Sequence, residues 1–261
     1  MRHVPTVALR ELRSLFVAPV AYIILSLFAV LAGFFFILDL AWFSETIFRM
    51  QQMQAFDRLA EVNLNDHLIM QFLGSMSVVL LFLIPGITMS LYAAEKTNGT
   101  QELLLTSPLT IWDIVVGKFL GAATFVTLLV AVVGLYPLIL FLYGDPEVGK
   151  TLAGLLGMLL TGWTYVAIGA FASSLSRSQV VAFLTTFVLL LFLLLIPAMS
   201  DLGASRGAGA LADAMRWLST GPHFEQLAKG LVDTADLVYF AVMIGAFLLL
   251  TKASVESVRW R

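Results

Sequence analysis

Long apolar runs alternate with short polar segments along the chain, and this pattern indicates the fold class. A helix needs about 20 mostly apolar residues to cross about 30 Å of hydrocarbon. Six runs reach or approach this length, at residues 20–40, 69–93, 115–143, 151–173, 180–199 and 237–252. The sequence therefore predicts an all-α integral membrane protein with six transmembrane helices, forming a single domain over residues 1–261.

The amphipathic pattern of the first residues predicts a short helix before the first span. In residues 1–18, Val4, Ala8 and Leu12 fall on one helical face, while Arg10 and Arg13 fall on another. Such a helix suits the inner membrane surface, with its apolar side against the lipid. Pro19 then breaks the segment before the first span. The alternative is that these residues are the frayed start of that span.

A polar segment at residues 94–114 separates the second span from the third. Asn98-Gly99 ends the helix that emerges from the second span. Thr100 can cap a new short helix, and Glu102 lies in its first turn, where negative charge suits the helix dipole. Residues 103–105 are all Leu and give this helix an apolar side.

The same segment then turns back into the membrane. Ser107-Pro108 breaks the short helix, and Thr110 and Asp113 have the T-x-x-D spacing of a capping box that opens the third span. Three consecutive leucines outside the membrane are costly to expose to water. Either the chain's own helices or a docked partner would shield them.

The loop at residues 201–236 is expected to be partly helical and to lie at the outer membrane surface. Leu211, Met215 and Leu218 recur at helical spacing, and Trp217 suits an interface. Gly221-Pro222 is expected to separate this helix from a second one, which carries Phe224, Leu227 and Leu231.

The composition supports a membrane protein and excludes several kinds of site. Hydrophobic residues make up 60% of the chain and charged residues 12%, whereas a soluble domain is about 45–50% apolar and about 25% charged. The absence of Cys excludes a disulfide framework, a thiolate metal site and a Cys nucleophile. The three His lie far apart, outside the apolar runs. We therefore expect no metal or proton site built on His, no cofactor and no nucleic-acid partner.

Basic residues favour one side of the membrane. If both termini and the even-numbered loops share a side, that side carries nine Lys and Arg residues and the other side six. Because Lys and Arg concentrate in cytoplasmic loops, we expect both termini to face the cytoplasm. No small-residue cleavage site follows the first apolar run, so a cleavable signal peptide is not expected.

The predicted spans contain almost no ionisable side chain. Charges at depth are expensive and usually functional, and Asp39 is expected to be a solvated residue at the outer end of the first span. This argues against a proton- or sodium-coupled transporter, a voltage sensor and a rhomboid-like protease, which would need a His within a span. The energy for any work must come from somewhere else.

Small residues recur in the spans at a spacing that lets helices approach closely. The pairs are Gly117 and Gly121, Ala29 and Gly33, and Gly169 and Ser173. Two interpretations remain open, namely packing within one chain and contact between two copies.

Residues 144–151, GDPEVGKT, match the phosphate-loop pattern G-x-x-x-x-G-K-[ST]. A phosphate loop follows a buried strand in a soluble α/β sheet, but here the neighbouring residues belong to the third and fourth spans. Gly144, Pro146 and Gly149 suit a tight turn instead. We expect the match to be a decoy in an outer turn, and the chain not to be an ATPase.

The segment EKTNGTQELLLTSPLTIWDIVVGKFLG strongly resembles the E-x-x-x-G-T-x-E-L-L-L-T-S-P segment of type-2 ABC exporter permeases. Within that superfamily it looks most like the gliding-motility-associated permease group. RELRSLFVAPVAY, AIGAFASSLSRSQ, GPHFEQLAKGLVD and SVESVRWR resemble the same group, so the resemblance covers essentially the whole chain. One departure is the near-neutral stretch before Gly99, which is often more basic in the superfamily.

This resemblance implies a half-transporter in the bacterial cytoplasmic membrane. It would pair with a second copy or a close paralogue, and a cytoplasmic ABC ATPase would dock under each half. In the gliding group an auxiliary membrane protein with a large outer domain is a further expected partner. The residues that would couple to the ATPase are Glu95, Gly99, Thr100, Glu102, Leu103, Leu104, Leu105, Ser107 and Pro108.

Two functions follow from the resemblance. The first is the permease subunit of an ABC exporter, which uses ATP hydrolysis by its partner to move a substrate. The second is a mechanotransmission subunit, which drives an outer-domain partner and moves no substrate. A third possibility, a channel without an ATPase, leaves Leu103, Leu104 and Leu105 unexplained.

Overall fold

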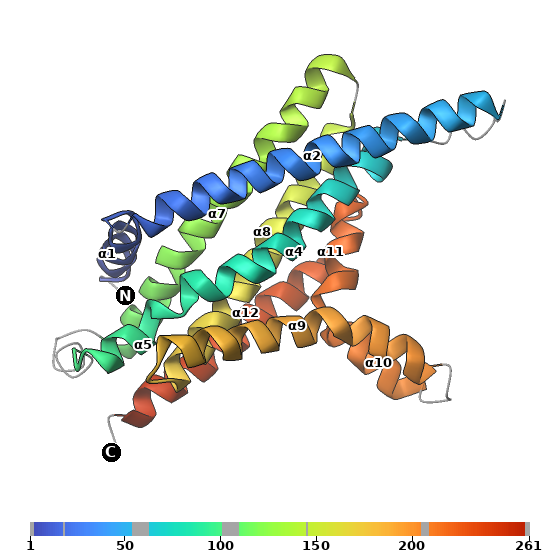
Figure 1. The fold of residues 1–261 in the computed structure, drawn as a ribbon. Coiled ribbons are helices and arrows are strands. Elements are labelled where there is room, and N and C mark those ends of the chain that lie inside the picture. The colour runs from blue at the N-terminus through green and yellow to red at the C-terminus, as the bar shows by residue number, and fades with distance from the viewer. Residues whose placement is uncertain are drawn as a thin grey trace.

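The computed structural model describes residues 3–17, 19–53, 63–100, 110–144, 146–204 and 209–258. Every regular element in these ranges is helical, as Figure 1 shows. In chain order they are α1 (Val4–Val17), α2 (Val20–Gln52), the π-helical turn η1 (Asn65–Ile69), α4 (Met70–Thr88), α5 (Ser90–Thr97), α7 (Ile111–Tyr143), α8 (Val148–Leu175), α9 (Gln179–Ala204), α10 (Gly209–Leu218), α11 (Thr220–Ala228) and α12 (Thr234–Val258).

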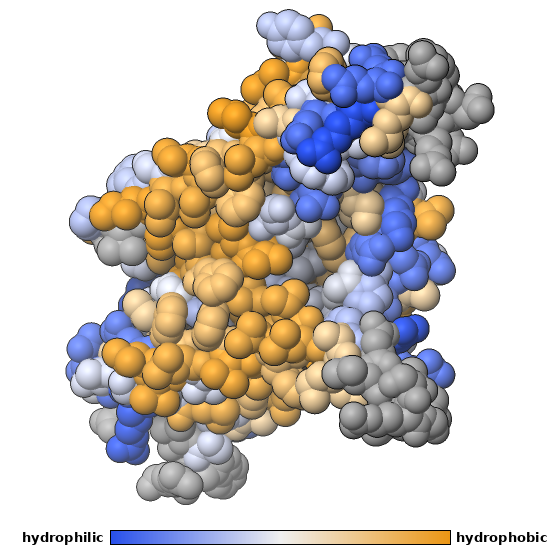
Figure 2. Space-filling model, turned by 45° about the vertical axis from the view of Figure 1, so that its right-hand side comes forward, coloured by the Kyte–Doolittle hydropathy of each residue, from blue (hydrophilic) through white to orange (hydrophobic). Residues whose placement is uncertain are grey.

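The prediction of an all-α protein with six spans is confirmed. Six helical segments of the described chain are long and apolar enough to cross a membrane. They are Ala21–Gln52, Asn65–Thr97, Ile111–Tyr143, Val148–Leu175, Gln179–Met199 and Thr234–Ser257. Figure 2 shows broad apolar areas on one face, with hydrophilic side chains toward the margins, as expected for a lipid-facing surface.

The fourth span, α8, forms the centre of the bundle. Within an apolar stretch of 18 residues, 67% of the residues of α8 are buried, whereas in the corresponding stretch of α2 only 22% are buried. α8 contacts α4, α7, α9, α11 and α12, and its small residues permit this. A Cβ at Gly162 would come within 2.7 Å of Val126, and one at Gly154 within 2.7 Å of Leu73. The first span therefore lies at the periphery, and the fourth organises the core.

Contacts across the chain define the two ends of the bundle. At the "Gly99 end", the end of α5 lies beside α1, the start of α7 and the α8–α9 turn, as hydrogen bonds from Lys118 and Lys96 show. At the "Gly144 end", η1 contacts the start of α8 through Asn65. Figure 1 places both marked chain ends at the Gly99 end.

The first span is longer than predicted. The helix α2 continues from Val20 to Gln52, and 33 residues at about 1.5 Å each give about 50 Å. The apolar run ends near residue 40 because Ser44, Glu45 and Arg49 follow, but these residues stay helical. Asp39 therefore does not end the helix, because α2 continues on both sides of it. Its place at the outer interface stays a prediction.

All three small-residue pairs pack within the chain. A Cβ on Gly117 or Gly121 would come within 2.7 Å of α1, and one on Gly169 would overlap Thr88 of α4. Gly33 lies against Tyr136 of α7, whose hydroxyl donates a hydrogen bond to the carbonyl oxygen of Ala29 at 2.7 Å. Packing within one chain thus accounts for the spacing.

The loop between the fifth and sixth spans contains the two expected short helices, α10 and α11, but the break lies elsewhere. Ser219, not Gly221-Pro222, separates them. The Ser219 hydroxyl accepts a hydrogen bond from the N–H of Gly221 and caps α11. Pro222 is tolerated in the first turn because the N–H it lacks would have no helical partner there.

Candidate functional site

A buried lysine joins three helices at the Gly99 end. Lys118 Nζ donates hydrogen bonds to Glu11 Oε1 at 3.1 Å, Glu95 Oε1 at 2.8 Å and the carbonyl oxygen of Leu91 at 2.6 Å. Its side chain is 2% exposed, and Nζ lies 5.2 Å from the centre of the Tyr92 ring. An ammonium group has three donors, so every donor has a partner.

This cluster connects segments that are distant in sequence. Glu11 lies on α1, Glu95 on α5, and Lys118 two turns into α7. Burial of a charge is costly unless it is paired and hydrogen-bonded, so Lys118 holds both carboxylates in fixed positions. We call Glu11, Glu95 and Lys118 the "charge cluster".

Two glycines of α7 let α1 approach closely enough for Glu11 to reach Lys118. A Cβ at Gly117 would lie 2.6 Å from Val7 Cβ, and one at Gly121 would lie 2.7 Å from Glu11 Cβ and 3.0 Å from the carbonyl oxygen of Ala8. Real Cβ atoms do not approach so closely, so only glycine permits this contact. The first part of the N-terminal prediction is confirmed, since α1 is helical and ends before Pro19. Its position on the membrane surface stays a prediction.

A one-residue interruption at Met89 separates α4 from α5, the helix that carries Glu95. The helix α4 carries Pro85 and ends at Thr88, and α5 begins at Ser90. Ser173 Oγ donates to the carbonyl oxygen of Met89 at 3.0 Å and accepts from the N–H groups of Tyr92 at 3.1 Å and Ala93 at 3.2 Å. One hydroxyl of α8 therefore supports the backbone at this break.

The end of α5 is closed by backbone geometry and by contacts with the α8–α9 turn. Gly99 has a φ of 69°, and the N–H groups of Gly99 and Thr100 bond to the carbonyl oxygens of Lys96 and Glu95. This is the Schellman arrangement that ends many helices, as expected for Asn98-Gly99. Lys96 Nζ also donates to the carbonyl oxygen of Ser174, and Thr97 Oγ1 to that of Arg177 at 2.6 Å.

The C-terminal side of the polar segment, where α7 begins, is also anchored. Thr110 Oγ1 accepts a hydrogen bond from the Asp113 N–H at 3.2 Å, and Asp113 Oδ2 accepts one from the Thr110 N–H at 3.3 Å. The predicted capping box is therefore confirmed. A chain of nine residues, 101–109, thus runs between two fixed points.

The predicted coupling residues divide into two groups. Glu95 belongs to the charge cluster, and Gly99 and Thr100 form the helix end. The others lie outside the described residues, and their predicted roles stay predictions. They are Glu102, Leu103, Leu104, Leu105, Ser107 and Pro108.

Sequence reasoning missed Glu11, Lys118 and Ser173. Lys118 is one of the nine basic residues expected on the cytoplasmic side, but it lies in the third helical turn of α7, where a charge indicates a partner. Its two carboxylate partners are 107 and 23 residues away. The small residues at Gly117 and Gly121 were the available signal that another helix packs beside Lys118.

The phosphate-loop match lies at the Gly144 end, in the connection from α7 to α8. Gly144 ends α7, and Lys150 and Thr151 lie in the first turn of α8. Lys150 Nζ is 3.2 Å from Glu147 Oε1 and 3.7 Å from Asp66 Oδ2. Thr151 Oγ1 donates to the carbonyl oxygen of Glu147 at 3.1 Å. These side chains hold the connection together, with helices on both sides.

His223 forms a second buried polar contact, also at the Gly144 end. Its Nδ1 lies 2.6 Å from Asp236 Oδ1, its Nε2 lies 3.1 Å from the carbonyl oxygen of Trp217, and its ring stacks on Tyr239 at 3.9 Å. This contact fastens α11 to the start of α12. Within the described ranges, no three His, Asp or Glu residues gather as a metal site would require.

The spans, the lipid-compatible surface and the anchored polar segment define a helical multi-pass membrane protein. The chain belongs to the ABC-2 family of transporter proteins, whose family model matches residues 6–255.

A curated relative, named "Probable multidrug ABC transporter permease YbhR", is 29% identical over 140 residues in Escherichia coli (strain K12), and the protein of that name in Escherichia coli O157:H7 matches equally. The match covers 52% of this chain and 36% of each relative. The chain thus accounts for well under half of the length of these relatives.

Proposed function

We propose that the chain is the transmembrane permease subunit of an ABC exporter, and that ATP hydrolysis by a separate ATPase subunit drives it. Membership of the ABC-2 family and the permease name of the relatives support this function. The subgroup associated with gliding motility belongs to the same proposal, because it rests on the resemblance of the short sequence segments given above.

The observation that carries the coupling mechanism is the charge cluster. Lys118 ties α5 to α7 on the two sides of residues 101–109, and Glu11 adds α1 to the same unit. A force on this segment would therefore move α1, α5 and the start of α7 together instead of bending a loop. The ATPase would grip residues 101–109 and move the inner ends of two spans.

The orientation follows from this mechanism and from the basic residues. The Gly99 end would face the cytoplasm of a bacterial cell, with both termini, and the Gly144 end would lie outside. Residues 144–151 would then be remote from ATP. On this proposal the phosphate-loop match is a decoy, and ATPase activity belongs to the partner.

A second copy or a close paralogue would complete the transport unit. Large apolar side chains are exposed along one span that could meet such a partner, and they include Val181, Leu184, Val188 and Phe192 of α9. Lipid would cover the exposed faces that no partner covers.

One observation favours the alternative function, mechanotransmission to an outer-domain partner. The helix α2 is about 50 Å long, which exceeds the roughly 30 Å of hydrocarbon that a span must cross. Its last turns extend toward the Gly144 end and expose Phe48. An auxiliary membrane protein with a large outer domain could contact this extension.

Reconstitution distinguishes the two functions. The full chain is purified with the ATPase that accompanies it and placed in liposomes, and both ATP hydrolysis and movement of a lipophilic dye are measured. An exporter couples the two, whereas a mechanotransmission subunit hydrolyses ATP and changes conformation without dye movement. Absence of any associated ATPase would overturn both functions.

A further inference from the structure

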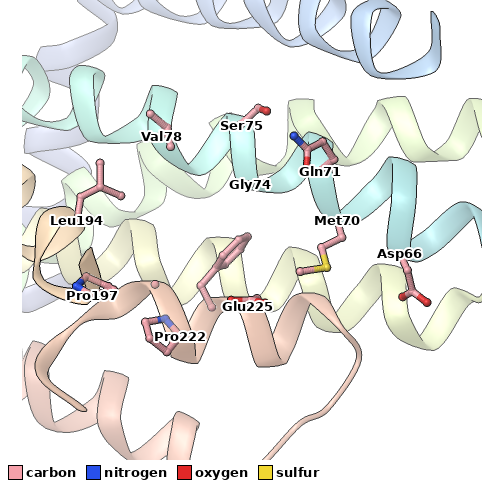
Figure 3. Close-up of a pocket in the computed structure, with 12 residues that line it drawn as sticks. Asp66, Met70, Gln71, Gly74, Ser75, Val78, Leu194, Pro197, Pro222 and Glu225 are labelled. Carbon is pink, nitrogen blue, oxygen red and sulfur yellow. The ribbon is translucent and has the colours of Figure 1, made fainter. Parts of the chain in front are cut away.

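A cleft opens between α4 and α11 at the Gly144 end. Its volume is about 570 Å³, within the range of about 300–1,000 Å³ that suits small-molecule ligands. Figure 3 shows Met70 extending from α4 toward α11 in this space, with Asp66 on the preceding turn η1 and Gln71 and Ser75 on the other side of α4. Phe224 of α11 and Leu194 of α9 also line it.

A second, smaller cavity adjoins the cleft on the side of the central helix. This cavity of about 100 Å³ shares Gly74, Leu194 and Phe224 with the cleft and reaches Thr161 and Tyr165 of α8. Thr161 is 13 residues from the start of α8, which places it about 20 Å along this helix. The cleft lies at the end of the bundle, and the cavity beside it reaches the middle.

Thr161 supplies independent evidence for a ligand. It is 2% exposed, and its Oγ1 has no hydrogen-bond partner among the residues that the structure describes. Five other buried threonines of the spans each donate to the carbonyl oxygen four residues earlier; they are Thr88, Thr151, Thr164, Thr186 and Thr251. An unpaired buried hydroxyl is costly, so its position beside a cavity indicates that a polar group can occupy that cavity.

The charge at the mouth indicates the kind of ligand. Asp66 and Glu225 line the cleft, and its lining, which lies within the described ranges, includes no Lys, Arg or His. Each carboxylate has a lysine nearby, but Lys150 is 3.7 Å from Asp66, and Lys229 pairs with Glu225 at an exposed site. Exposed pairs are weak, so both carboxylates can exchange these partners for a ligand cation.

We propose that this cleft binds an amphipathic organic cation. The positive group would lie between Asp66 and Glu225, and the apolar body would contact Met70, Leu194 and Phe224. A hydrogen-bonding group at the inner end would reach Thr161. As a substrate class, such a cation rests on the export function proposed above; as a ligand of this cleft, it does not require the ATPase.

The test is a binding measurement on the full chain in nanodiscs without ATPase. The probe is rhodamine 6G, a cationic xanthene with N–H donors, and its binding is followed by fluorescence anisotropy after subtraction of empty nanodiscs. Fluorescein ethyl ester has a related frame and is anionic at neutral pH, so we expect it to bind about tenfold or more weakly. Because ATP hydrolysis is not measured, failure here leaves the coupling mechanism intact, and failure of coupling leaves this result intact.

Two glycines of α4 give a matched pair of variants. A Cβ at Gly74 or at Gly86 would meet no atom within 4 Å, but only Gly74 lines the cleft. We expect Gly74→Leu to weaken rhodamine 6G binding about tenfold or more by filling the cleft, and Gly86→Leu to leave it unchanged. Thermal unfolding of both variants checks that they fold.

Two further changes test the chemistry of the cleft. The double variant with Asp66→Asn and Glu225→Gln should lose the preference for the cation, and Thr161→Val should weaken binding by a smaller factor. This double variant alters exposed side chains, so it keeps the test decisive even if Gly74→Leu does not fold. No specific binding of rhodamine 6G, equal binding of the anion, or unchanged binding by the double variant would overturn the proposal.

Discussion

Lys118 Nζ lies 2.8 Å from Glu95 Oε1, and this contact joins the third span to the helix that leads into the polar segment. The two residues stand on either side of residues 101–109, and Lys118 also donates a hydrogen bond to Glu11 of α1. The buried Lys118 therefore links the two helices that flank the segment. A backbone cap at Gly99 and a capping box at Thr110 fix the helix ends themselves. A partner that binds the segment would act on a rigid unit.

The charge cluster should be essential for stability. We expect Lys118→Met to lower the free energy of unfolding by about 3–5 kcal/mol, because two largely buried carboxylates lose their common partner. The measurement is unfolding of the purified chain in detergent by denaturant or heat.

A compensating variant separates charge from packing. When Lys118→Met is combined with Glu11→Gln and Glu95→Gln, no unpaired charge remains, and most of the lost stability should return. If Lys118→Met alone unfolds like the unmodified chain, the cluster is not buried as described.

Gly117 and Gly121 of α7, which pack against α1, should tolerate no side chain. Gly121→Ala places a Cβ 2.7 Å from Glu11 Cβ, so we expect a loss of about 1–3 kcal/mol from overpacking. Gly86→Ala is the matched control, because its Cβ would meet open space. Equal unfolding curves for the two variants would show that α1 does not pack against α7 in this way.

The sequence was sufficient for the six spans because each is a long apolar run, and a bilayer imposes a minimum length. It was insufficient for the end of α2. The charged residues Glu45 and Arg49 lower the hydropathy after residue 40, but they pair with each other at 2.6 Å across one helical turn and leave the helix intact. Hydropathy reports contact with lipid, not where a helix ends.

The site was predicted only where its signals are local. The helix end at Gly99 and the capping box of Thr110 and Asp113 depend on residues within a few positions of each other, and both are confirmed. The charge cluster could not be found in this way, because Glu11 and Lys118 meet only after α1 folds back onto α7. The break at Ser219 was missed for a related reason. Pro222 marks the start of a helix as readily as a gap between two helices.

The two ends of the bundle should lie on opposite sides of the membrane. The chain has no Cys, so single cysteines introduced by Asn98→Cys and Val232→Cys can be labelled without background. A membrane-impermeant maleimide should modify the Val232 position in intact cells and the Asn98 position only after permeabilisation. The reverse pattern would invert the proposed orientation.

Lys150 should have no role in nucleotide binding. Its contacts with Glu147 and Asp66 are partly exposed ion pairs, so we expect Lys150→Ala to change the free energy of unfolding by less than about 1 kcal/mol. The ATP affinity of the complex with its ATPase should stay unchanged. A loss of about tenfold, equivalent to 1.4 kcal/mol of binding free energy, would show that residues 144–151 are a nucleotide site after all.

The polar segment itself is tested by two substitutions outside the described residues. Glu102→Lys would reverse a charge in the first turn of the predicted short helix and cost it only about 0.3–1 kcal/mol. Leu104→Asp would place a charge in the predicted contact surface. If the three leucines instead pack against the chain's own spans, Leu104→Asp should destabilise the subunit, and Glu102→Lys should do little.

The most direct test of coupling is to measure ATPase co-purification and ATP hydrolysis for Leu104→Asp beside the thermal stability of the subunit alone. The proposed mechanism predicts a subunit as stable as the unmodified chain, whose ATPase either dissociates or hydrolyses ATP without any response at the Gly144 end. A stable Leu104→Asp subunit that binds its ATPase and couples normally would contradict it.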